Sequence, residues 1–185
     1  MSHRALAASL SLFLCACAGT GAEPQVPSTT GGETGVPPGG AKAPDFELPT
    51  LDGGHASLQQ YRGKVVLIDF WSTICDPCLQ EMPELVKLYQ AKKDKGFVVL
   101  AIATDGPETA ANVSAKAKEK NMIFPVLLDS ETAALDRYDP EGRLPFTEVI
   151  DKGGNVVLKR SGYQPGDAES QKRLVEAIDK ALAAP

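Results

Sequence analysis

Two cysteines, Cys75 and Cys78, stand two residues apart at the junction of an apolar run and an amphipathic stretch. The apolar run covers 65–70 and the helix-like stretch covers 79–93, so the pair falls where a buried strand turns into a helix. Unpaired N–H groups and the positive dipole end of a helix N-terminus lower a thiol's pKa, and the thiolate is the attacking species in thiol-disulfide exchange. The spacing predicts a redox pair in which Cys75 is the exposed nucleophile and Cys78, turned inward, resolves the mixed disulfide.

A structural disulfide and a metal site are the alternative interpretations of this pair. A bridge across so short a loop stabilises a fold by only about 2 kcal/mol, against about 3 kcal/mol for a 15-residue loop. A structural zinc site needs four ligands, and three of the remaining candidates, His3, Cys15 and Cys17, lie in a segment typical of targeting signals. The composition therefore favours redox chemistry, and we expect no metal.

The first residues of the chain predict export. Arg4 precedes the apolar stretch 5–14, which is too short for a transmembrane helix and fits a secretory signal. Cys17, with a small residue before it and Leu14 three positions back, resembles the lipidated cysteine of bacterial lipoproteins, although Cys15 stands where that motif usually has a small residue. We expect a lipoprotein signal at 1–17, with an ordinary signal peptide, cut near residue 18 or 22, as the alternative.

Residues 18–42 are rich in glycine and proline and poor in large apolar side chains, which predicts a flexible tether. Residues 43–185 have the size of one domain with one core. The formal net charge of the chain is −5 and no basic stripe is present, so we expect no nucleic-acid partner. We also expect a monomer.

Apolar and amphipathic runs alternate along the predicted domain, which indicates an α/β fold with a mixed sheet covered by helices on both faces. The ranges 45–48, 64–71, 97–103, 124–128, 146–150 and 156–160 read as strands, with a hairpin turn at 153–154. The ranges 79–93, 108–120, 131–138 and 169–183 read as helices.

The order of elements and four motifs together resemble the thioredoxin fold, and in particular the exported thiol-disulfide oxidoreductases of the TlpA and ResA type. The motifs are Ala-Pro-Asp-Phe at 43–46, Gly-Lys-Val-Val-Leu-Ile-Asp-Phe-Trp at 63–71, Cys-Asp-Pro-Cys-Leu-Gln-Glu-Met-Pro at 75–83 and Leu-Pro-Phe-Thr-Glu-Val-Ile-Asp at 144–151. The resemblance covers nearly all of 43–183 and implies a central mixed β-sheet flanked by helices.

The resemblance also implies how a client is bound. Pro145 matches the family's cis-proline facing the cysteine pair, which leaves the backbone of Leu144 open to pair with an incoming peptide. A trans proline at the start of a strand is the alternative. Trp71 is a second residue expected to contact the client.

Two acidic residues are expected to modulate the redox pair. Glu81 lies where ResA-type relatives carry an acid near the thiols, and it is either a partly buried proton relay with a raised pKa or a solvated glutamate of the first turn. Asp69 interrupts an apolar strand, where an acid needs a task or a partner. It is either a proton shuttle beneath Cys78 or a structural hydrogen-bond acceptor.

Residues within and beside the motif are expected to set its potential and its partners. Asp76 places a negative charge near the nucleophile, which disfavours the thiolate and favours a reductant over an oxidant. Pro77, between the cysteines, is expected to modulate the couple as well. Ile74 replaces the tryptophan most relatives have, so the rim is less aromatic and partner choice is expected to differ.

The sequence as a whole predicts an extracytoplasmic or periplasmic disulfide reductase with no cofactor beyond the Cys75–Cys78 disulfide. Such compartments are oxidising, so the protein needs a source of electrons, and the resemblance implies a membrane protein that donates electrons through thiols. In the family that this chain resembles, the clients include apocytochrome c. There are three alternatives. A thiol peroxidase is disfavoured because Ser72 and Ile68 stand at the positions of the peroxidase motif, and a copper-binding assembly factor is disfavoured because His55 is the only histidine outside the signal that could bind copper. The third alternative is a non-catalytic lipoprotein.

Overall fold

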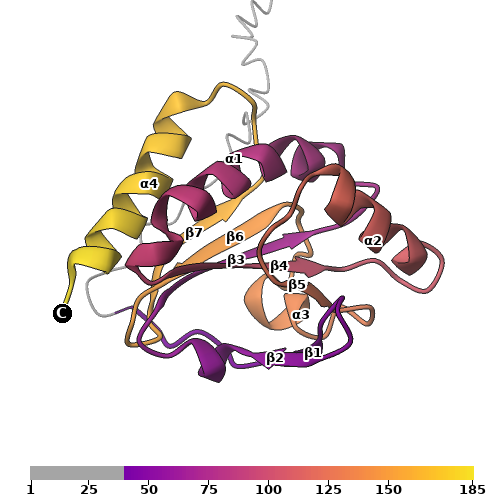
Figure 1. The fold of residues 1–185 in the computed structure, drawn as a ribbon, viewed down its shortest axis with the longest axis horizontal. Coiled ribbons are helices and arrows are strands. Elements are labelled where there is room, and N and C mark those ends of the chain that lie inside the picture. Colours follow the sequence, from indigo (N-terminus) through magenta and orange to yellow (C-terminus); the bar gives the residue numbers. More distant parts are fainter. Residues whose placement is uncertain (1–39) are drawn as a thin grey trace, which may run out of the picture.

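A computed structural model describes residues 40–185 of the chain (Figure 1). The predicted signal at 1–17, the lipid-bearing Cys17 and most of the predicted tether lie outside the described residues. Ala41 and Lys42, at the end of that tether, already contact the domain: Ala41 accepts a hydrogen bond from the N–H of Val156, and Lys42 forms a bridge with Asn155. Within residues 40–185, no helix is long and apolar enough to cross a membrane.

A five-stranded mixed sheet forms the centre of the domain, in the order β5-β4-β3-β6-β7. Its strands are β3 (Val65–Trp71), β4 (Phe97–Ala103), β5 (Val126–Leu128), β6 (Phe146–Ile150) and β7 (Val156–Ser161). The strands β3, β4 and β5 are parallel, and β6 and β7 are antiparallel to their neighbours. The strands β3, β4 and β6 are buried along their whole length, which explains why β4 is apolar throughout and β3 is apolar except at Asp69.

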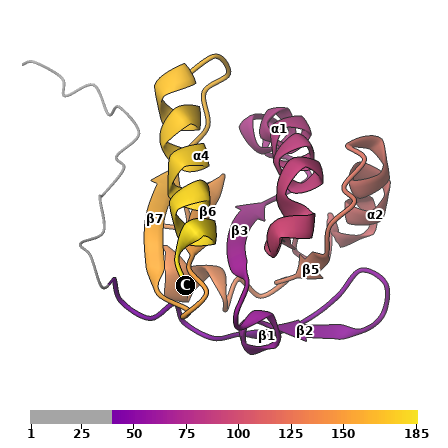
Figure 2. The same cartoon turned by 60° about the vertical axis from the view of Figure 1, so that its left-hand side comes forward.

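Helices cover both faces of this sheet, as the sequence predicts. Along one face lie α1 (Asp76–Lys92), α2 (Ala110–Glu119) and α4 (Ala168–Ala183), with α1 and α4 side by side (Figures 1 and 2). The other face carries α3 (Leu135–Tyr138) and a small hairpin of β1 (Glu47–Pro49) and β2 (His55–Ser57) (Figure 1). Two short 3₁₀ helices, Leu58–Tyr61 and Lys93–Lys95, are the remaining helical elements of the described residues.

Two apolar cores follow from the alternation of side chains along the strands. Leu67 and Trp71 of β3 belong to the core beneath α1, α2 and α4, whereas Ile68 and Phe70 belong to the core on the side of α3. Asp69 has the same parity as Leu67 and Trp71, so the fold directs this acid toward α1.

Candidate active site

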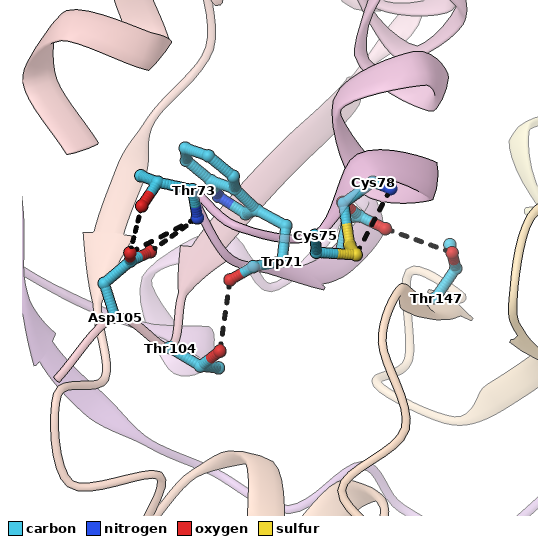
Figure 3. Close-up of a disulfide and its surroundings, with 8 residues drawn as sticks. Trp71, Thr73, Cys75, Cys78, Thr104, Asp105 and Thr147 are labelled. Atoms are coloured by element: carbon cyan, nitrogen blue, oxygen red, sulfur yellow. Dashed lines mark hydrogen bonds between the residues drawn. A yellow bond between two sulfur atoms is a disulfide. The ribbon is translucent and has the colours of Figure 1, made fainter. Parts of the chain in front are cut away.

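The cysteine pair lies at the junction of β3 and α1 and forms a disulfide with an S–S distance of 2.03 Å (Figure 3). Cys75 is the N-cap of α1, and its sulfur accepts a hydrogen bond from the N–H of Cys78 at 3.3 Å. The Cys75 sulfur therefore faces the unpaired N–H groups and positive dipole end of the helix, the surroundings that stabilise a thiolate after reduction.

The two sulfurs differ in their access to solvent. Cys75 is half-buried, whereas Cys78 is completely buried in the core beneath α1. Ile74, the residue before Cys75, has 77% of its surface exposed. A client can therefore approach Cys75, and Cys78 is accessible only from within the protein.

The loop between β3 and Cys75 is held by the end of β4 (Figure 3). The carboxylate of Asp105 accepts hydrogen bonds from the N–H of Thr73 at 3.0 Å and from its hydroxyl at 2.5 Å. The N–H and hydroxyl of Thr104 both donate to the carbonyl of Trp71. These anchors could not be predicted from the sequence, because Asp105 stands in an Asp-Gly-Pro run that is typical of an ordinary turn.

The residues expected to bind a client lie in different surroundings. The Leu144–Pro145 bond is cis, in agreement with the prediction. Leu144 is half-buried, and like Cys75 it packs against the core beneath α1, whereas Pro145 is buried. Asp76 and Pro77 are exposed in the first turn of α1.

Trp71 does not fit its predicted role. Its side chain is fully buried, because odd-numbered residues of β3 point into the core beneath α1. A client that approaches Cys75 finds no indole surface, so the prediction that Trp71 contacts the client is wrong for this conformation.

Asp69 and Glu81 both lie on the α1 side of the sheet, and both are fully buried. Asp69 accepts a hydrogen bond from the hydroxyl of Thr147 at 3.1 Å, and Glu81 forms an ion pair with Arg160. Burial, followed by the charge of Glu81, raises the pKa of Asp69 well above its usual value.

Burial also raises the pKa of Glu81, to about 7, against the opposing effect of Arg160. The solvated glutamate that the sequence left open as an alternative is thus not what the structure shows. Arg160, which is 3% exposed, was missed because it lies on the last strand, far from the motif in sequence.

Within residues 40–185, no group of three His, Cys, Asp or Glu side chains is arranged to hold a metal ion. The site thus offers two thiols, two buried carboxyls and a buried guanidinium. Such a set can exchange disulfides at Cys75 and hold a proton close to Cys78.

Residues 39–159 match the model of the AhpC/TSA family. The chain is 39% identical over 139 residues to the thiol-disulfide oxidoreductase ResA of Geobacillus thermodenitrificans, covering 75% of this chain and 77% of the relative. It is 38% identical over 125 residues to ResA of Bacillus cereus, covering 68% of this chain and 70% of the relative.

Solved structures agree with this grouping. A thiol:disulfide interchange protein of the thioredoxin family from Chlorobium tepidum superposes with a TM-score of 0.65 at 28% identity, covering 78% of this chain and 97% of that one. A thiol:disulfide interchange protein from Bacteroides sp. gives a TM-score of 0.62 at 30% identity, covering 74% of this chain and 87% of that one. The domain has the thioredoxin-like fold, and the chain belongs to the AhpC/TSA family as a thiol-disulfide oxidoreductase similar to ResA.

Proposed function

We propose that this oxidoreductase reduces disulfides of client proteins outside the cytoplasm. The observation that carries the proposal is the asymmetry of the pair: Cys75 is accessible at the N-terminus of α1, and Cys78 is sealed beneath it. In the reduced protein the Cys75 thiolate attacks one sulfur of the client disulfide, and the other client sulfur leaves with the electron pair. Cys78 then attacks Cys75, which releases the second client thiol and restores the disulfide.

One feature supports reduction over oxidation as the net direction. Asp76 brings a carboxylate into the first turn of α1, directly after the nucleophile. A negative charge there disfavours the Cys75 thiolate, and a less stabilised reduced form makes a weaker oxidant. The ResA relatives are named oxidoreductases, which covers both the reduction and the oxidation of clients. The assignment as a reductase therefore rests on the charge of Asp76.

The remaining parts of the proposal concern the neighbours of the pair. The backbone of Leu144, beside the cis-Pro145, pairs with the client. Glu81 exchanges protons with the thiols, and Asp69, a buried acid beneath Cys78, modulates the couple through Glu81. Pro77 restricts the backbone of the first turn of α1 between the cysteines. Haem-attachment cysteines of apocytochrome c are a candidate client. No cofactor beyond the Cys75–Cys78 disulfide takes part.

The proposed location follows from the first residues of the chain. Lipid on Cys17 anchors the domain to the outer side of a bacterial membrane, where a membrane thiol transporter supplies electrons. Mass spectrometry of the protein purified from the membrane fraction tests this part: a lipid-modified N-terminal Cys17 supports it, and an unmodified N-terminus near residue 18 or 22 contradicts it.

The direction of the reaction is tested by the reduction potential of the Cys75–Cys78 couple, together with turnover of insulin disulfides. Dedicated reductants lie near about −270 mV and dedicated oxidants near about −120 mV. We expect a value close to the first and catalysed insulin reduction. A potential near the second contradicts the assignment as a reductase while leaving the oxidoreductase chemistry intact.

A further inference from the structure

Three buried polar side chains form one row across the sheet beneath α1. Asp69 of β3 lies directly opposite Thr147 of β6, and Thr147 lies directly opposite Arg160 of β7. The hydroxyl of Thr147 donates to Asp69 at 3.1 Å and accepts from Arg160 at 3.4 Å. Arg160 in turn donates to Glu81, which α1 brings down onto the end of the row. The four side chains form one continuous chain of contacts.

This chain lies on the same side of the sheet as the resolving thiol. Cys78 belongs to the core that contains Leu67 and Trp71, the residues two positions on either side of Asp69. Glu81 follows Cys78 by three residues on α1, so the two side chains share one face of the helix. In the view of Figure 3, Thr147 and Thr73 are drawn on opposite sides of the cysteine pair.

The charges of the row do not balance unless it holds a proton. Two buried carboxyls face a single guanidinium, and each of these three groups is at most 3% exposed. Within residues 40–185, neither Oδ2 of Asp69 nor Oε2 of Glu81 has a hydrogen-bond partner. A second ionised carboxylate would be buried without compensation, which is far costlier than burying the neutral acid.

The contacts also indicate which carboxyl is neutral. Glu81 touches the guanidinium of Arg160 directly, whereas Asp69 reaches it only through the hydroxyl of Thr147. The titratable groups that act on Glu81 are Asp69, Glu84, Arg160 and Tyr163, and Arg160 is the only cation among them. Removal of this cation therefore leaves nothing in this set that favours the ionised form of Glu81.

We propose that Arg160 is a positioning residue that keeps Glu81 ionised and the proton of the row on Asp69, so that Glu81 is the base that accepts the proton of Cys78. This inference rests on the proposed thiol-disulfide exchange. In the mixed disulfide the S–H bond of Cys78 breaks and an O–H bond forms on Glu81. The Cys78 thiolate then attacks Cys75, the bond between Cys75 and the client breaks, and the client thiolate leaves with the electron pair. Glu81 afterwards returns its proton to solvent or to that thiolate.

The test separates the attack of Cys75 from the resolution by Cys78. Reduced protein is mixed with a chromogenic aryl disulfide, which releases one coloured thiolate when Cys75 attacks and a second when Cys78 resolves. In Arg160→Met, Glu81 is mostly protonated at neutral pH, so we expect the second phase to slow by about fivefold or more at pH 7. Its pH midpoint should rise by about one unit or more.

Two further variants show whether the charge is responsible. Arg160→Lys retains a cation and should keep a midpoint near that of the wild type. Lys159→Met is the matched control, because this neighbouring cation of β7 pairs with Glu148, at 2.5 Å, away from the row. It should leave the midpoint unchanged. A wild-type midpoint in Arg160→Met, or an equal shift in Lys159→Met, overturns the proposal.

Infrared spectroscopy of the oxidised protein tests the proton's location without turnover, and without an Arg160 variant that must fold. At about pH 8, above the Glu81 pKa of about 7, the band of the protonated carboxyl in the wild-type protein should shift when aspartate is labelled with ¹³C at its side-chain carboxyl and stay in place when glutamate is labelled. The opposite pattern overturns the inference. Because this readout needs no client, it stands or falls separately from the reductase function.

Discussion

The carboxylate of Asp105 binds both the backbone N–H and the hydroxyl of Thr73, two residues before the nucleophile Cys75. This contact joins the end of β4 to the loop that leaves β3 (Figure 3). Asp105 is 3% exposed, so its hydrogen bonds are shielded from water. If the carboxylate is removed, water cannot easily take its place as the acceptor for Thr73.

Asp105→Ala is expected to destabilise the oxidised protein by about 2 kcal/mol, because it leaves the buried N–H of Thr73 without a partner. Urea denaturation measures the free energy of unfolding. Asp94→Ala, which removes an exposed acid from the 3₁₀ helix at Lys93–Lys95, is the control and should stay within about 0.5 kcal/mol of wild type. Equal effects in the two variants would show that the contact does not hold the loop.

Glu81 makes the stability of the oxidised protein depend on pH. Its pKa is about 7 in the folded protein and about 4.3 in the unfolded chain. Between these values the folded state binds more protons, so the free energy of unfolding falls as pH rises, by up to about 1.4 kcal/mol per pH unit from this group. Asp69 acts in the same direction, because its pKa is also raised.

Glu81→Gln removes this titration while keeping an oxygen that accepts from Arg160. We expect the decline in stability between about pH 5 and pH 7 to be shallower in this variant than in the wild type. Urea denaturation at several pH values provides the comparison, with the exposed Glu131→Gln as control. If Glu81→Gln follows the wild-type slope, Glu81 is not the buried acid that titrates there.

Ile74 is an exposed apolar side chain directly before Cys75, and it is expected to be covered when a client binds. Ile74→Ser should lower kcat/KM for insulin reduction about fivefold, equivalent to about 1 kcal/mol, and leave stability within about 0.5 kcal/mol. The control is Ile123→Ser, because Ile123 is 43% exposed and precedes β5, at the end of the sheet away from the disulfide. Similar losses in both variants would argue against a client contact at Ile74.

The bounds of two buried strands could be predicted residue by residue. The strands Phe97–Ala103 and Phe146–Ile150 have the predicted bounds, because both are buried on two faces and end at polar or turn residues. The strand His55–Ser57 was missed, since three residues of mixed character carry no periodicity. The helix predicted over 131–138 is confined to Leu135–Tyr138, because Thr132 adopts a positive φ and Asp129 binds the N–H groups of Ala134 and Leu135.

The site was predictable where its chemistry is local in sequence. Cys75 caps a helix that begins at Asp76, so the placement of both sulfurs could be derived from the motif and its flanks. Arg160 and Thr147 could not be found this way. Their meeting with Asp69 depends on the register of β3, β6 and β7, which joins residues far apart in the chain and is set by tertiary pairing.

In the proposed reaction Cys75 is the nucleophile and Cys78 is the resolving thiol. The decisive measurement is mass spectrometry of the reduced Cys78→Ser and Cys75→Ser variants after incubation with insulin. Cys78→Ser cannot resolve the intermediate, so it should accumulate a mixed disulfide between Cys75 and an insulin cysteine, whereas Cys75→Ser should form almost none because Cys78 is buried. Trapping through Cys78, or equal trapping in both variants, would contradict the account.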